Sequence, residues 1–165
     1  MPMTLHQNYR NLKELLSHPE FQRGEHWHQT HFDANEQVIK EGESGTDIFV
    51  VLQGTLMVCT DVIVTESRHL QSGLCELFDG EEFALSCFFN DESHSATVKT
   101  LTPCKLAVID SSKLRHFLET RPDIGYCILF HWIEKLLPRL RQDNRRISSI
   151  FSWGLKAHKI DVELE

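Results

Sequence analysis

The stretch Ala34–Val58, ANEQVIKEGESGTDIFVVLQGTLMV, decides the fold of this chain. Two short apolar-rich segments within it, residues 37–40 and 47–52, have the composition of strands, and Glu41–Gly45 between them has the composition of a turn. Gly54 follows the second segment and predicts another hairpin, because glycine supplies the positive φ that a tight reversal needs. Short strands at intervals of about 8–12 residues favour an antiparallel sandwich or barrel over alternating strands and helices.

The same stretch resembles the opening of a cyclic-nucleotide-binding domain, the regulatory β-roll of the catabolite-activator family and of cyclic-nucleotide-gated kinases and channels. The matching frame is Val38-x-x-Glu41-Gly42-Glu43-x-Gly45-x-x-Ile48-Phe49-x-Val51-x-x-Gly54. The resemblance covers about residues 21–146 and implies a jelly roll with a regulatory role. Transcription factors of the family continue into a winged helix-turn-helix, for which the roughly 19 residues after Arg146 are too few. We therefore expect a stand-alone regulatory module.

Composition excludes several partners and compartments. The 165 residues carry a net charge of −7, which repels phosphate backbones, so a direct nucleic-acid partner is not expected. No apolar run approaches the roughly 20 residues that cross a bilayer, and the first residues lack a secretory apolar region. The five cysteines are scattered without a CxxC pair and are typical of reduced thiols. A cytoplasmic protein without membrane contact is the expectation.

The predicted fold class is mainly β with flanking helices: an antiparallel double-stranded β-roll (jelly roll) plus an N-terminal helix and a C-terminal dimerisation helix. Apolar spacing predicts a short helix over residues 8–16 and another over Ser111–Glu119, capped by Ser111 or Ser112. Pro122 suits the first position of a further helix. The expected organisation is an N-terminal helical segment at 1–25, a cyclic-nucleotide-binding-like β-roll at 26–121, C-terminal helix or helices at 122–151 and a tail at 152–165.

Apolar residues in the C-terminal helical region recur at heptad spacing, which predicts a homodimer. A buried amide at Asn144 would favour a two-stranded pairing. The alternative is a helix that simply lies on the β-roll. Pro138 interrupts the pattern and either kinks one helix or separates two. The predicted dimer seam consists of Tyr126, Phe130, Ile133, Leu137, Leu140, Asn144 and Ile147, and the heptad pattern ends at Phe151.

Residues 77–98, LFDGEEFALSCFFNDESHSATV, resemble the phosphate-binding cassette of the same family. In the family a Gly-Asp-x-Phe-Gly-Glu string leads into a short helix, and a string that begins with arginine closes the site. Here Ala84 stands at the second glycine, Leu85 at the glutamate and His94 at the arginine. The resemblance implies these candidate ligand-binding residues: Gly80, Phe83, Ala84, Leu85, Ser86, His94, Ser95 and Ala96.

The two departures weaken the expected binding of a cyclic nucleotide. Leu85 cannot accept the hydrogen bond of a ribose hydroxyl, a loss of about 1–3 kcal/mol. At position 94 a histidine, which offers at best one aimed donor, replaces a charged phosphate contact worth about 1.5–3 kcal/mol. Together they lower the affinity by roughly two to four decades. We expect a regulatory, small-molecule-sensing module with weak or lost cAMP and cGMP binding, open to another small anionic ligand, and with no resident cofactor.

Two other interpretations remain at this level. His26, His28 and His31 lie close together, as in metal-dependent cupin enzymes, but the cupin spacing to a glutamate and a further histidine is missing. No metal site and no enzymatic activity are therefore expected, since nucleophile motifs are also absent from the sequence. Alternatively, the chain is a ligand-free interaction subunit whose tail at 148–165 binds a protein partner. The arginines of the last predicted helix suggest a solvated face and are Arg139, Arg141, Arg145 and Arg146.

Overall fold

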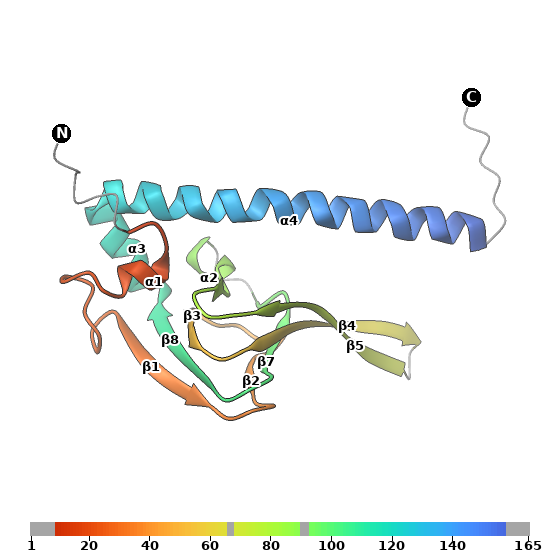
Figure 1. The fold of residues 1–165 in the computed structure, drawn as a ribbon, viewed down its shortest axis with the longest axis horizontal. Helices are drawn as coiled ribbons and strands as arrows, with labels where there is room; N and C mark the ends of the chain where they lie inside the picture. Colours follow the sequence, from red (N-terminus) through yellow and green to blue (C-terminus); the bar gives the residue numbers. More distant parts are fainter. Residues whose placement is uncertain (1–8, 66–67, 90–92, 158–165) are drawn as a thin grey trace.

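A computed structural model describes residues 9–65, 68–89 and 93–157. Two antiparallel four-stranded sheets form the body of the molecule, with the helices gathered on one side (Figure 1). The first sheet has the order β1 (Trp27–Phe32), β8 (Cys104–Asp110), β3 (Asp47–Gln53) and β6 (Glu82–Phe83). The second has the order β2 (Gln37–Ile39), β7 (Thr97–Thr100), β4 (Leu56–Thr65) and β5 (Arg68–Leu77). The predicted β-roll is confirmed.

Strand β3 shows why the first sheet is apolar along its length. Successive side chains of a strand point to opposite faces. Ile48 and Val50 belong to the core that the helices cover, whereas Phe49 and Val51 belong to the core between the two sheets. Burial on both faces therefore replaces the usual alternation of apolar and polar residues.

The predicted hairpins within Ala34–Val58 are wrong. Strands β2 and β4 belong to the second sheet, whereas β3 lies between β8 and β6 in the first. The turns themselves are present, with Gly42 at φ +82° and Gly54 at φ +105°, but each carries the chain across from one sheet to the other. The composition of a turn predicts that the chain reverses direction there. It does not predict which strand the next strand pairs with, because that depends on residues far along the chain.

The first helices differ from prediction mainly at their ends. Helix α1 (Leu12–Leu15) is shorter than expected and begins after Asn11, whose side chain caps it. Helix α2 (Ser86–Phe89) follows β6, and α3 (Ser111–Thr120) follows β8. The cap of α3 is Asp110 and neither predicted serine, because β8 stays extended through Asp110 and Ser111 is already helical. The Asp110 carboxylate accepts hydrogen bonds from the amides of the second and third helical residues at 2.9 and 3.0 Å.

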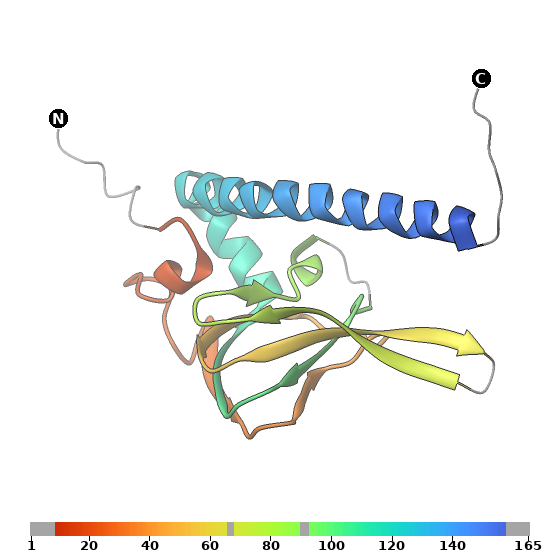
Figure 2. The same ribbon diagram turned by 45° about the vertical axis from the view of Figure 1, so that its right-hand side comes forward.

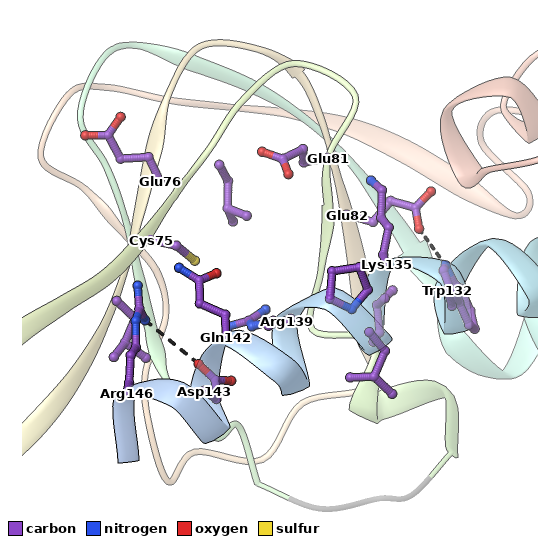
Figure 3. A pocket seen from close by; sticks show the side chains of 15 residues that line it. Cys75, Glu76, Glu81, Glu82, Trp132, Lys135, Arg139, Gln142, Asp143 and Arg146 are labelled. Atoms are coloured by element: carbon purple, nitrogen blue, oxygen red, sulfur yellow. Dashed lines mark hydrogen bonds and ion pairs between the residues drawn. The ribbon is translucent and has the colours of Figure 1, made fainter. Parts of the chain in front are cut away.

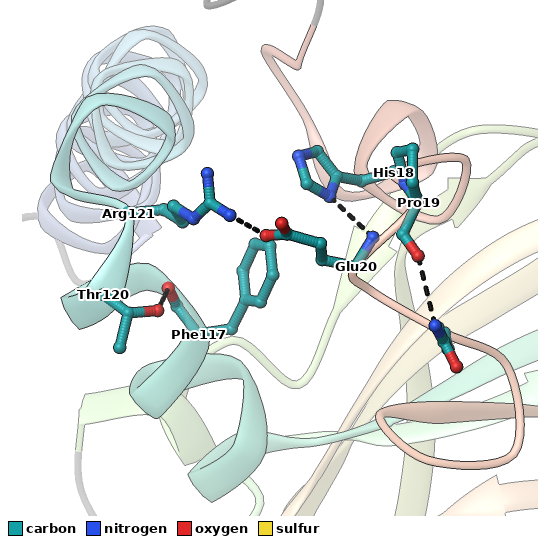
Figure 4. A network of polar contacts seen from close by, with 7 residues as sticks. His18, Pro19, Glu20, Phe117, Thr120 and Arg121 are labelled. Carbon is teal, nitrogen blue, oxygen red and sulfur yellow. Dashed lines mark hydrogen bonds and ion pairs between the residues drawn. The ribbon is translucent and has the colours of Figure 1, made fainter.

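The N-terminal segment is tied to the junction that follows α3 (Figure 4). Arg121 forms an ion pair with Glu20, and the Nδ1 atom of His18 accepts a hydrogen bond from the Glu20 amide at 3.1 Å. Burial, and then the charge of Arg121, lower the pKa of His18. The ring of His18 also meets Phe117 of α3 edge-on, with 5.4 Å between the centroids. The segment before the roll thus helps to hold α3 in place.

Helix α4 (Pro122–Ala157) is one continuous helix of 36 residues with Pro138 inside it, so the chain does not divide there and the helix passes the predicted end at 151. At about 1.5 Å per residue it is roughly 54 Å long. It lies alongside the β-roll (Figure 2), and Ile124, Ile128 and Trp132 near its start are buried. Within the described ranges, no helix combines the length and apolarity that a membrane span requires.

The predicted seam of α4 is not covered by the protein's own roll. Its apolar members are exposed by between 47% (Leu137) and 68% (Tyr126), and Asn144 is exposed as well. The residues that pack on the core come from another face of the helix. The alternative in which the seam is ordinary core packing therefore does not hold for this chain.

Two carboxylates at the end of the first sheet have opposite pKa shifts. Asp47 and Asp110 are partners across β3 and β8. Hydrogen bonds, first from the Ser112 side chain and then from the Lys113 amide, lower the pKa of Asp110. Burial, and then the negative charge of Asp110, raise the pKa of Asp47.

Stability should therefore respond to pH in opposite directions at these two positions. A lowered folded-state pKa means that the contribution of Asp110 is present at neutral pH and is lost as pH falls through that pKa. Asp110→Asn keeps a capping side chain but loses the charge at the helix N-terminus, so we expect about 0.3–1 kcal/mol of destabilisation near pH 7 and less in acid.

Asp47→Asn should stabilise the protein near pH 7, because the raised pKa of Asp47 means that its charge is unfavourable in the folded state. The stabilisation should fade in acid, where Asp47 is protonated. Urea denaturation at both pH values checks this, and a destabilised Asp47→Asn near pH 7 would contradict it.

Candidate ligand-binding site

The backbone of the cassette has the two left-handed residues that its turns need. Gly80, between β5 and β6, has φ +88°, and its amide donates to the Val51 carbonyl at 2.7 Å. Ala84, before α2, has φ +59°. A left-handed conformation costs a residue with a Cβ about 1–2 kcal/mol, so Ala84 adopts at this cost a conformation that a glycine adopts freely.

The two residues of β6 point in opposite directions and connect different parts of the molecule. Phe83 is buried and stacks on Phe49, with ring centroids 4.9 Å apart. The Oε1 atom of Glu82 accepts a hydrogen bond from the Leu12 amide at 2.6 Å, and its Oε2 atom accepts one from Nε1 of Trp132 at 2.6 Å. Glu82 thus ties α1, the cassette and α4 together, a role that no spacing in the sequence indicates.

Leu85 and Ser86 form the entrance to α2. Leu85 is half-buried and packs against the core below the helices, while Ser86 is exposed. The amides of Cys87 and Phe88 already donate to the carbonyls of Ala84 and Leu85, at 3.2 and 3.1 Å. These two amides are therefore not available to a ligand in this conformation.

His94 lies inside the protein, between α2 and the turn that precedes β3. It is 7% exposed, and its Nδ1 atom is 4.0 Å from the Sγ atom of Cys87. Its ring rests on Gly45, where an added Cβ would lie 2.5 Å from Nε2. The His94 amide donates to the Glu43 carbonyl, and its own carbonyl accepts from the Gly42 amide, both at 2.9 Å. His94 thus anchors the segment before β7 to the turn between β2 and β3. The exposed Ser95 and the half-buried Ala96 lead from it into β7.

Two of the cavities beside the cassette are lined by one of the substituted positions each. The larger, of about 690 Å³, lies between β5, the cassette and α4 (Figure 3). Leu85 forms part of its wall. The smaller, of about 210 Å³, is lined by His94 together with Ser44, Asp47 and other residues around the β2–β3 turn. The structure therefore places Leu85 and His94, the two substituted positions, on different cavities.

The model of the cyclic nucleotide-binding domain family matches residues 29–121, more than half of the chain. This chain belongs to that family. The resemblance seen in the sequence, and the regulatory β-roll that it implied, are confirmed.

The similarity to known proteins covers about three quarters of this chain and part of each protein described here. The chain is 28% identical over 126 residues to the cAMP-activated global transcriptional regulator CRP of Haemophilus influenzae, which covers 76% of this chain and 53% of that protein. It thus spans about half the length of this curated relative. A cyclic nucleotide-binding domain from Methylobacillus flagellatus superposes with a TM-score of 0.65 at 19% identity, over 75% of this chain and 67% of that one. The Catabolite Activator Protein of Thermus thermophilus gives 0.62 at 14% identity, over 75% and 55%.

Helix α4 contributes residues to the larger cavity that the sequence analysis missed. Trp132, Lys135 and Gln142 line it, and so do Arg139 and Arg146 of the arginine cluster. The interpretation of that cluster as one solvated face was therefore too simple. The signal in the sequence was the spacing by four and three that continues the buried positions of the first part of the helix.

The three histidines near β1 have separate surroundings. The Nδ1 atom of His26 accepts a hydrogen bond from the Gln22 amide at 3.1 Å, and its ring packs on Phe21 with centroids 4.8 Å apart. Nε2 of His31 lies 3.3 Å from the side-chain nitrogen of Gln29. Across the described ranges, no three His, Cys, Asp or Glu side chains are grouped so that they could hold a metal ion.

Proposed function

We propose that this chain is a cytoplasmic regulatory module that senses a small molecule through a modified cyclic-nucleotide-binding domain, binds cAMP and cGMP weakly or not at all, and works as a homodimer. The observation that carries the proposal is that Gly80 and Ala84 have positive φ values in a segment that resembles the family's cassette, whereas two side chains of the family's pattern are replaced there. Gly80 and Ala84 have the required positive φ values, but Leu85 and His94 stand where glutamate and arginine bind ribose and phosphate.

The surroundings of these two residues support weak binding. Leu85 packs against the core and offers no acceptor for a ribose hydroxyl. The ring of His94 is occupied between Gly45 and Cys87, so it does not project a charged group as an arginine would. A regulatory β-roll with this cassette needs a different ligand, or a different way of holding one.

Restoring the family residues should restore part of the affinity. We expect the double variant Leu85→Glu with His94→Arg to bind cAMP about tenfold to a hundredfold more tightly than the natural chain, and more tightly than either single variant. Isothermal titration calorimetry measures this directly. His116→Arg on the exposed face of α3 is the matched control, since it adds the same charge outside the cavities that Leu85 and His94 line.

Two outcomes would count against the proposal. Micromolar or tighter cAMP binding by the natural chain would mean that other residues hold the nucleotide. Equal affinities for the double variant and the natural chain, with the fold intact by circular dichroism, would mean that Leu85 and His94 are not at the nucleotide site.

A further inference from the structure

The face of α4 that is turned toward the β-roll changes character along the helix. Ile124, Ile128 and Trp132 are buried on it, and the same spacing continues with Lys135 and Arg139. Gln142 and Arg146 extend this line further along the wall of the cavity. A helix that only covered a core would stay apolar along its packed face. The change coincides with the start of the 690 Å³ cavity.

A cationic stripe, formed by Lys135, Arg139 and Arg146, lies on the side of α4 opposite the dimer seam. Successive residues of a helix rotate by about 100°, so Leu137 of the seam and Arg139 of the stripe project about 200° apart. Arg141 and Arg145 do not line the cavity. A second chain on the seam would leave the stripe facing the cavity of its own roll.

Most acidic groups on the cavity wall are already engaged. Both carboxylate oxygens of Glu82 accept hydrogen bonds, Glu81 accepts one from the Phe78 amide at 2.9 Å, and Asp143 lies 3.8 Å from Arg146. Lys135 and Arg139 have neither a hydrogen bond nor an ion pair with any residue in the described part of the chain. The helical wall of the cavity therefore presents two cationic side chains without an ion-pair partner among the described residues, within a lining that holds four carboxylates and three cations.

The opposite wall offers a hydrogen-bond acceptor, and an apolar surface lies between the two walls. Figure 3 shows Lys135, Arg139 and Gln142 on α4, with Cys75 and Glu76 of β5 across the cavity. Glu76 is exposed and can accept a hydrogen bond from a hydroxyl or amino group. Between the two ends the lining is apolar, from Leu74, Leu77, Leu85 and Leu136.

We propose that this cavity binds a nucleoside monophosphate whose terminal phosphate lies between Lys135 and Arg139, on the wall opposite the family's usual phosphate position. Side chains four residues apart on a helix are neighbours, about 5–6 Å between Cβ atoms, so both can contact one phosphate. A terminal phosphate carries close to two negative charges at neutral pH and matches two cations, whereas a cyclic phosphodiester carries one. A volume of 690 Å³ is within the usual 300–1,000 Å³ of small-molecule sites. The inference rests on the proposed function and names its ligand class.

The test is calorimetry on the full chain with the four nucleoside 5′-monophosphates, cAMP and adenosine. At least one monophosphate should bind more tightly than both adenosine and cAMP. Arg139→Gln and Lys135→Gln should each weaken that binding about tenfold to a hundredfold, as expected for loss of a charge-assisted contact. Arg141→Gln removes the same charge from the same helix outside the cavity and should change affinity by less than about threefold, through screened long-range attraction.

The possible results separate this inference from the proposed function. If no monophosphate binds more tightly than adenosine, or if Arg141→Gln weakens binding as much as Arg139→Gln, the inference is overturned. If the Leu85→Glu and His94→Arg variant gains cAMP affinity while no monophosphate binds the natural chain, the inference fails and the proposed function stands. If cAMP binds the natural chain tightly and Arg139→Gln has no effect, both fail.

Discussion

Replacing Leu140 and Ile147 together by lysine should abolish the proposed dimer and leave a monomer. In the single chain these side chains are 52% and 64% exposed, and they belong to an apolar line that continues along α4. Contiguous exposed apolar patches of this kind mark interaction surfaces. Pairing two such helices would bury the substituted lysines without a compensating charge, at a cost of several kcal/mol per site, which opposes the pairing.

Sedimentation velocity at tens of micromolar distinguishes the two states. Ile150→Lys is the matched control, because Ile150 is exposed by 68% on the same helix but lies off the seam. That control should remain dimeric, and circular dichroism should show an intact fold in every variant. A natural chain that is already monomeric at this concentration would remove the dimer from the proposal.

Gly54→Ala should lower the free energy of unfolding by about 2–5 kcal/mol, the largest loss that we expect from adding one methyl group to this domain. Gly54 has φ +105°, where a Cβ costs about 1–2 kcal/mol. The added atom would also lie 2.6 Å from Sγ of Cys104 and 2.7 Å from the Pro103 carbonyl oxygen. Forcing such contacts apart in a packed region costs about another 1–3 kcal/mol. The residue sits where the chain crosses from β3 to β4, so the strain acts on both sheets.

Gly42→Ala separates the two contributions. Gly42 has φ +82°, but no atom of the described structure lies within 4 Å of its added Cβ. Gly42→Ala should therefore lower the free energy of unfolding only by the cost of the backbone conformation, about 1–2 kcal/mol. Urea denaturation of both variants measures the difference. Equal losses would show that Cys104 and Pro103 give way easily, against the packing seen around Gly54.

The turns of the roll show how far the sequence predicted the fold. The glycines at 42 and 54 and the short apolar segments around them indicate reversals and strands, because both signals are local. Whether β3 pairs with β2 and β4 or crosses to another sheet depends on β8 and β6, which lie far along the chain. The sequence therefore predicted an antiparallel roll correctly and assigned the wrong partners to its first strands.

For the candidate site, too, the sequence predicted some features and not others. A resemblance to a known cassette pointed to Leu85 and His94 as departures, because position in a motif is read along the chain. It did not show that His94 packs against Gly45 and Cys87, or that Glu82 bonds to Trp132, because these contacts join residues from separate elements. Which atoms of a motif face a cavity is a property of packing.

Helix α4 shows most clearly what the sequence determines and what only the tertiary structure decides. Its sequence alone predicted the apolar heptad line, since helical periodicity assigns each residue to a side, and it also contains the line through Trp132 and Arg139 that the sequence analysis missed. Only the tertiary structure decided which side meets the roll. Burial of Ile124 and Ile128 at the start of the helix orients the whole of it, because a helix is rigid enough to carry one end's rotation to the other. That orientation turns Lys135 and Arg139 toward the cavity and leaves the heptad line exposed.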